Sequence, residues 1–110
     1  IEAVDLPDGE YKLGSLTVYV ESGRARLADG TLAGSTLTME RAVKNMIELA
    51  GASLEDASRM ASLNPAKLLG LDYRKGSIAV GKDADLVALD DDFNVRLTVV
   101  EGRIVYNNLK

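Results

Sequence analysis

The chain has 110 residues, of which 46% are apolar and 27% are charged, the proportions of an ordinary folded protein. The net charge is −4 with 13 basic residues scattered along the sequence, and no apolar run reaches the ~20 residues of a membrane span, so neither nucleic acid nor membrane is expected as a partner. The absence of cysteine removes disulfides and thiolate chemistry and fits a reducing compartment such as the cytoplasm, and the chain has no histidine either.

The N-terminal part is predicted to be irregular up to residue 9 and to form short strands over residues 10–28. Apolar residues alternate with polar ones in this stretch, at Leu16, Val18 and Val20. Ser22-Gly23 is a turn signal, so the pattern predicts a β-hairpin. Asp5 and Asp8 precede it in a turn-rich stretch and are interpreted as solvated turn residues.

A first helix is predicted over residues 39–50. Its apolar residues recur at helical spacing on one face, namely Met39, Ala42, Val43, Met46, Ile47 and Ala50. Thr38 is expected to cap the start, and Gly51 stands at the expected end.

A second helix is predicted to begin at Ser53, which forms a capping box with Asp56. Asn64-Pro65 is expected to end it, because proline disfavours helical geometry in the residue before it. The same pair would open a short third helix that Gly70 closes.

The C-terminal part is predicted to consist of strands. These are expected in the SIAV segment at residues 77–80, over 83–90, and in a hairpin of 97–100 and 103–106 around Glu101-Gly102. Strands with apolar residues on both faces need a partner layer, so we expect further segments to complete the structure. The first residue is not Met, which also suggests a native chain that begins upstream.

A stretch rich in glycine and hydroxyl groups, Asp29–Ser35, runs into the first helix. Gly30 and Gly34 would let the backbone approach another group closely, and a helix start favours oxygen-rich or anionic ligands. The spacing is not that of a P-loop, because Ser35 stands where a lysine should come after the second glycine. A plain connection that needs two glycines explains the same residues.

Charged residues offer weaker candidates. Asp83 and Asp85 would share a strand face and could grip a hard cation, although such carboxylates usually form turns or are solvated. The acidic run at residues 90–92 is interpreted as a solvated turn before Phe93. Three arginines could hold a phosphate, although solvated surfaces are the favoured interpretation: Arg24, Arg26 and Arg41.

Two strings carry a resemblance to a known family. LADGTLAGS, residues 27–35, resembles the loop before the last barrel helix of N-acetylglucosamine-6-phosphate deacetylases, members of the amidohydrolase superfamily. GSIAVGKDADLVALD, residues 76–90, resembles the C-terminal strands of many amidohydrolases. The resemblance implies an α/β fold: a C-terminal fragment of a metal-dependent (β/α)8 barrel with its final helices in residues 1–70, and strands of an appended β-sandwich in residues 71–110.

The resemblance also implies a function. The parent enzyme would hydrolyse N-acetylglucosamine 6-phosphate to glucosamine 6-phosphate and acetate with a divalent metal, zinc or iron. Leu32, Ala33 and Gly34 match the positions that cover the substrate. The opening residues resemble the segment directly after the family's catalytic Asp, so we expect no catalytic or metal-binding residue in this chain and no activity from it alone. The implied partners are the sugar phosphate, the remainder of the parent enzyme and a second copy in a homodimer.

Two alternatives stay open. The terminal strands would also fit another amidohydrolase, dihydroorotase-like or adenine-deaminase-like, in which the LADGTLAGS string is not expected. A non-catalytic module that oligomerises would account for the missing histidines, although its open apolar edges argue against it.

Overall fold

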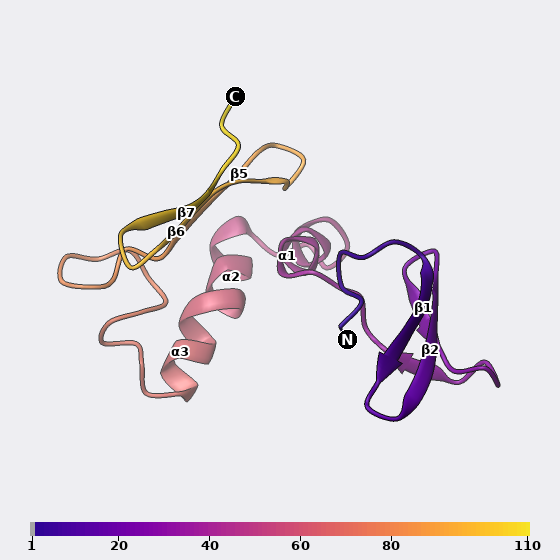
Figure 1. Ribbon diagram of the computed structural model, residues 1–110. Coiled ribbons are helices and arrows are strands. Elements are labelled where there is room, and N and C mark those ends of the chain that lie inside the picture. The colour runs from indigo at the N-terminus through magenta and orange to yellow at the C-terminus, as the bar shows by residue number, and fades with distance from the viewer. Residues whose placement is uncertain (1) are drawn as a thin grey trace. The chain divides into compact units, whose positions relative to one another are not determined.

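The computed structural model describes residues 2–110. It contains two compact units, Ile1–Thr38 and Met39–Lys110, which are described separately (Figure 1). The boundary between them falls at the start of the first helix. The division at residue 70 concerns the two parts of a parent enzyme and stays a prediction.

The first unit is a four-stranded antiparallel sheet in the order β1-β2-β3-β4. Its strands are β1 (Gly9–Leu13), β2 (Leu16–Glu21), β3 (Arg24–Arg26) and β4 (Leu32–Gly34). The predicted hairpin is confirmed as β2 and β3. Ser22 and Gly23 both have positive φ, 50° and 74°, which is the backbone that a two-residue hairpin turn requires.

The core of the first unit is built from small apolar side chains. Val18 and Val20 are 0% and 5% exposed, which confirms the alternation in β2, whereas Leu16 at the strand start is 50% exposed. Ala25 lies opposite Val20 in the β2–β3 ladder, and Ala3 completes the cluster. Burying a valine contributes about 1.5–3 kcal/mol, so this small core depends on two side chains.

The second unit begins with α1 (Met39–Glu48), which confirms the predicted first helix and ends two residues earlier than expected. Gly51 has φ 72°, the left-handed backbone of a helix end, and the Ala52 N–H donates to the Met46 carbonyl at 3.0 Å. No side chain of α1 is buried in the described chain.

A longer helical run comes next, made of α2 (Leu54–Ser58), η1 (Arg59–Leu63) and α3 (Asn64–Leu68), and Figure 1 shows it as one continuous coil. Ser53 caps it as predicted, because its hydroxyl oxygen accepts the Asp56 N–H at 3.1 Å.

Asn64-Pro65 opens α3 as predicted, but the predicted break in helical geometry before the proline is wrong. Asn64 is helical, with φ −62° and ψ −49°, and its N–H bonds to the Arg59 carbonyl five residues back. The run thus continues through a π-type turn into α3, where proline at the start of the segment needs no N–H donor. Gly70 ends the run as predicted, with φ 68°.

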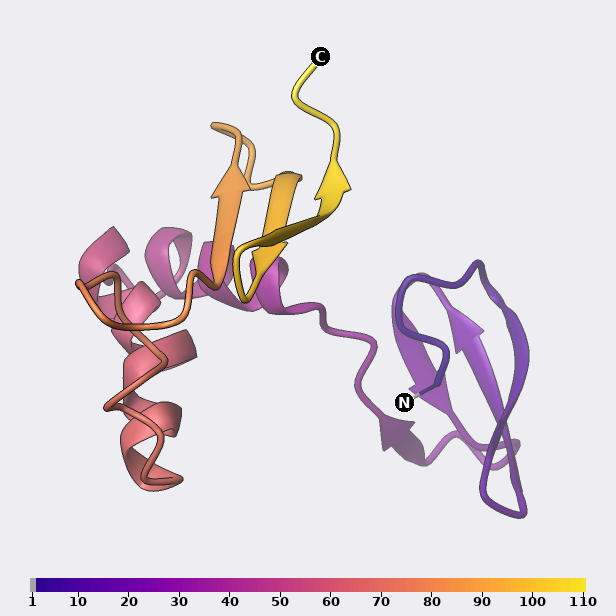
Figure 2. The same cartoon turned by 60° about the vertical axis from the view of Figure 1, so that its left-hand side comes forward.

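The C-terminal strands form an antiparallel sheet in the order β5-β6-β7 (Figure 2). They are β5 (Leu86–Leu89), β6 (Val95–Val100) and β7 (Arg103–Asn107), and Glu101-Gly102 is the turn of the predicted hairpin. The strand predicted at residues 77–80 is wrong. Ile78 and Val80 are almost fully exposed, because none of the described strands pairs with this segment.

Gly76 offers a test of how the connection from α3 to β5 packs on the helical run. A Cβ there would lie 2.8 Å from the Ala66 Cβ and 3.0 Å from the Leu63 Cα. Gly81 has nearly the same φ, 87° against 86°, and open space around it. We expect Gly76→Ala to lower the free energy of unfolding by about 1–3 kcal/mol more than Gly81→Ala, measured by urea denaturation. Equal losses would show that the loop does not pack on the helix.

Candidate functional site

The three residues expected at the substrate, Leu32, Ala33 and Gly34, form a strand rather than a loop. They make up β4, which pairs with β3 through Arg26 opposite Leu32 and Ala25 opposite Gly34. β4 is the last strand of its sheet, so its outer edge has no strand partner within the described residues. Its main chain is therefore open to a polar ligand on one side.

Ala33 is the extra residue of a β-bulge. The register shifts between Ala25 and Arg26, so Ala33 lies between two paired positions of β4. Its side chain is half-buried against the core cluster, while Leu32 is 68% exposed. Gly34 is exposed with φ 147°, a backbone that favours glycine. Bulges re-aim the chain and are frequent beside active sites.

The turn that leads into β4 is held by its own side chains. Asp29 Oδ1 accepts the Thr31 N–H at 2.9 Å, and this main-chain donor is the largest cause that lowers the pKa of Asp29. Arg26 Nη1 donates to the Gly30 carbonyl at 2.7 Å. Arg26 lies on the exposed face of β3, as expected, and its guanidinium also bonds to the turn. Arg24 is exposed.

The chain that leaves β4 is also anchored. Thr36 Oγ1 donates to the Gly23 carbonyl at 2.8 Å, which ties the exit of β4 to the β2–β3 turn. Ser35 Oγ accepts the Leu37 N–H at 3.0 Å. The expected contribution of a helix start to this site concerns the second unit, which begins at Met39, and stays a prediction. The phosphate-binding role considered for the exposed Arg41 also stays a prediction.

A second group of polar side chains lies in the other unit, around Lys75. Its ammonium nitrogen is 2.6 Å from Asp85, 3.0 Å from Asp83 and 3.5 Å from Glu101. Arg74 adds two hydrogen bonds to Asp83, at 2.7 and 2.9 Å. The carboxylates that were candidates for binding a cation are therefore already paired with a lysine of the same chain.

These contacts shift the ionisation of the group. The Arg74 hydrogen bond is the largest cause that lowers the pKa of Asp83, and the Lys75 hydrogen bond is the largest for Asp85. The same pairing with Asp85 raises the pKa of Lys75. Sequence reasoning missed Arg74, Lys75 and Glu101. The signal was a basic pair and an acidic pair on either side of a loop bounded by two glycines.

The metal that the resemblance implies does not fit the residues of this chain. Among residues 2–110, no three acidic side chains are grouped so that they could hold a metal ion, and the sequence has no histidine or cysteine. The same described residues include no helix long and apolar enough to cross a membrane.

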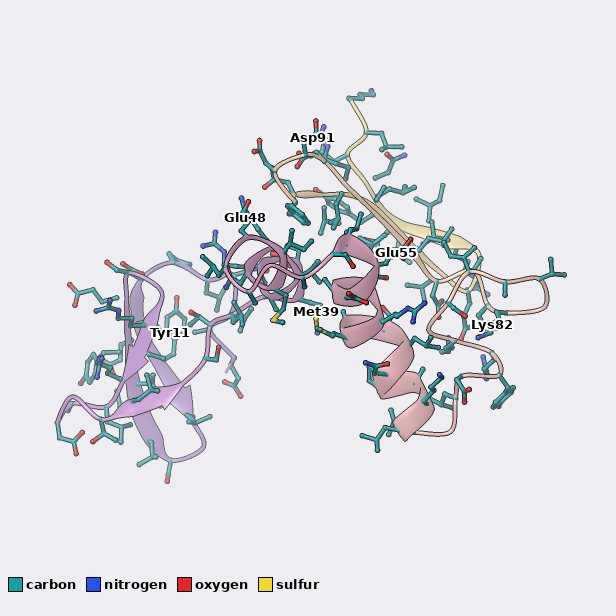
Figure 3. The ribbon with its side chains drawn as sticks, turned by 180° about the vertical axis from the view of Figure 1, so that it is seen from behind. Tyr11, Met39, Glu48, Glu55, Lys82 and Asp91 are labelled. Atoms are coloured by element: carbon teal, nitrogen blue, oxygen red, sulfur yellow. The ribbon has the colours of Figure 1, made fainter. Side chains whose placement is uncertain are left out.

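Two smaller predictions have different outcomes. The acidic run is confirmed as a turn between β5 and β6, where Asp91 is labelled in Figure 3, because Asp90 Oδ1 accepts the N–H groups of Asp92 and Asn94. Asp8 is more than a solvated turn residue, since its carboxylate accepts the Ser22 N–H at 2.9 Å.

The comparisons with known proteins define the class. The model of the amidohydrolase family matches residues 25–105, so the chain belongs to that family. It is 42% identical over 107 residues to the N-acetylglucosamine-6-phosphate deacetylase of Vibrio furnissii, covering 97% of this chain and 27% of that protein. It is 43% identical over 104 residues to the N-acetylgalactosamine-6-phosphate deacetylase of Escherichia coli O157:H7, covering 94% and 28%.

Solved structures agree with this assignment. The N-acetylglucosamine-6-phosphate deacetylase of Thermotoga maritima matches with a TM-score of 0.88 and 48% identity, over 97% of this chain and 29% of that one. A D267A mutant of the Mycobacterium smegmatis enzyme, in complex with N-acetyl-D-glucosamine-6-phosphate, matches with a TM-score of 0.82 and 38% identity, over 96% and 28%. The chain thus spans between a quarter and a third of the length of these relatives.

The charge group around Lys75 predicts a dependence of stability on pH. Asp83 and Asp85 have pKa values below the ordinary 3.8 when folded, so their contribution is present above that pH and is lost as the pH falls through the lowered values. We expect urea denaturation to show stability falling between about pH 5 and 2. Asp85→Asn should flatten this fall and Asp91→Asn should not. An unchanged profile in Asp85→Asn would contradict the pairing.

Proposed function

We propose that the chain is the C-terminal part of an N-acetylglucosamine-6-phosphate deacetylase, which hydrolyses this sugar phosphate to glucosamine 6-phosphate and acetate. The observation that carries the proposal is the similarity to enzymes of that name over almost the whole chain, at 42% and 48% identity. In this proposal residues 1–70 supply the end of the barrel domain and residues 71–110 supply strands of the small β-sandwich.

The part assigned to this chain is to position the substrate. The exposed edge of β4 would offer main-chain groups of Leu32, Ala33 and Gly34 to the sugar. The bulge supports this role, because it takes Ala33 out of regular pairing while its side chain stays against the core. Main-chain donors held in place suit an oxygen-rich ligand, since binding then costs little ordering of the protein.

The metal and the catalytic carboxylate would come from residues outside this chain. The amidohydrolase family indicates a metal-dependent enzyme, and zinc or iron is the ion that we propose. When bound, such an ion polarises the amide carbonyl and activates water. A homodimer in the cytoplasm completes the proposal.

The relatives favour this function over the alternatives. Those reported above are all named deacetylases, rather than dihydroorotase-like or deaminase-like enzymes, and family membership argues against a free-standing module. The Escherichia coli relative makes N-acetylgalactosamine 6-phosphate a second candidate substrate, because its identity of 43% equals that of the other relatives within a few per cent.

A chimaera tests the proposed function. Residues 1–110 would replace the matching segment of the Thermotoga maritima enzyme, with which they share 48% identity. We expect metal-dependent release of acetate from N-acetylglucosamine 6-phosphate, faster than from N-acetylgalactosamine 6-phosphate, and no turnover by the 110 residues alone. A folded chimaera that deacetylates neither sugar, or an isolated chain that turns over, would contradict the proposal.

Substitution of glycine tests the site. Gly34 and Gly14 both have positive φ, 147° and 60°, and both belong to the first unit, but only Gly34 is a proposed substrate contact. In the chimaera, Gly34→Ala should raise KM for the sugar phosphate by about tenfold or more, the effect of losing about 1.4 kcal/mol of binding. Gly14→Ala, at a position with open space around it, should leave KM close to that of the parent chimaera. Equal KM values in the two variants would remove Gly34 from the site.

A further inference from the structure

The proposed substrate strand is very short and lies at a sheet edge, yet both of its ends are attached to the rest of the unit. β4 has three residues, and its ladder with β3 holds two of them in register. A strand this short contributes few ladder hydrogen bonds, so its position depends on what holds the chain just before and just after it. Three side chains outside β4 do this.

The entry to β4 is closed by the turn that connects it to β3. The Leu27 N–H donates to the Thr31 carbonyl at 2.8 Å and the Gly30 N–H to the Leu27 carbonyl at 2.9 Å. Arg26 Nη1 and Asp29 Oδ1 then bind the Gly30 carbonyl and the Thr31 N–H. The turn therefore has both main-chain and side-chain hydrogen bonds across it. Each of the two side-chain bonds includes a charged group, and such bonds are stronger than neutral ones.

The exit from β4 is held by one hydroxyl. Thr36 lies two residues after Gly34, and its Oγ1 donates to the carbonyl of Gly23 at 2.8 Å. Gly23 is part of the tight β2–β3 turn, whose own geometry is set by two positive φ angles. The Ser22 N–H beside it donates to Asp8. Thr36 thus attaches the end of β4 to a rigid corner of the sheet.

We propose that Arg26 and Thr36 are positioning residues, which hold the main chain of Leu32–Gly34 in a preformed conformation for the sugar phosphate. This rests on the proposed function for the identity of the ligand. The segment then acts as a fixed wall of the site rather than as a mobile lid. Because the segment is already ordered before the substrate binds, none of the binding free energy is spent on ordering it.

Hydrogen exchange of the whole protein that contains this chain, without substrate, tests the positioning independently of activity. Thr36→Val removes the hydroxyl, and Arg26→Met removes the guanidinium but keeps an unbranched side chain. We expect the Leu32–Gly34 amides to exchange about two- to tenfold faster in each variant, the factor that one hydrogen bond supplies. The β1–β2 amides should stay as in the parent chain, which excludes unfolding of the sheet.

Matched variants supply the controls. Arg24→Met makes the same change two residues earlier on β3, and Thr17→Val removes a hydroxyl of β2 that accepts from Lys12 at 2.7 Å. Both should leave β4 exchange unchanged, and Thr36→Ser, which keeps the hydroxyl, should restore it. Unchanged β4 exchange in Thr36→Val and Arg26→Met would overturn the proposal.

The active chimaera tests the consequence for binding. Thr36→Val should raise KM several-fold with kcat nearly constant, because a wall that binds ground state and transition state alike affects KM alone. Thr36→Ser should return KM to its original value. Faster exchange with an unchanged KM would overturn the positioning role while leaving deacetylation in place, whereas loss of the proposed function would show as an inactive parent chimaera.

Discussion

Hydrogen bonding to a short edge strand is the constraint on which the candidate site depends. β4 is three residues long and carries a bulge, so the regular ladder alone gives it little support. Arg26, Asp29 and Thr36 supply that support from the two ends. Gly34 then has a backbone conformation, φ 147°, that favours glycine. A main chain held at both ends in this way would present its polar groups to a ligand without further ordering.

The second unit combines little apolar burial with a cluster of charge pairs. Ala57 and Ala66 are its buried apolar residues in the described chain, while Leu68, Ile78 and Leu49 are more than 80% exposed. Lys75 instead joins the loop after α3 to the start of β5 and to the β6–β7 turn. Lys82, labelled in Figure 3, closes the same loop through Ser77 Oγ at 2.7 Å and the Asp72 carbonyl. Extensive exposed apolar surface agrees with a chain that packs against further protein.

Local signals in the sequence predicted most elements, and contacts distant in sequence decided the rest. The apolar period of α1, the Ser53 cap and the Glu101-Gly102 turn are set by neighbouring residues, so they could be predicted. The π-type turn before Pro65 depends on a hydrogen bond between residues five apart, so a rule based on the Asn-Pro pair alone could not predict it. The segment at 77–80 has strand-like residues but no pairing strand. The resemblance predicted Leu32–Gly34 as a site and that stays a prediction, whereas the pairing of these residues with β3 and the Arg26–Gly30 hydrogen bond needed coordinates.

We propose that the outer edge of β4 meets a phosphorylated amino sugar. A crystal structure of the whole protein that contains this chain, with N-acetylglucosamine 6-phosphate bound, tests it most directly. We expect main-chain atoms of Leu32–Gly34 within about 3 Å of the sugar's polar atoms, with the Arg26 and Thr36 hydrogen bonds unchanged from the unbound protein. A sugar bound elsewhere, with water alone along β4, would contradict it.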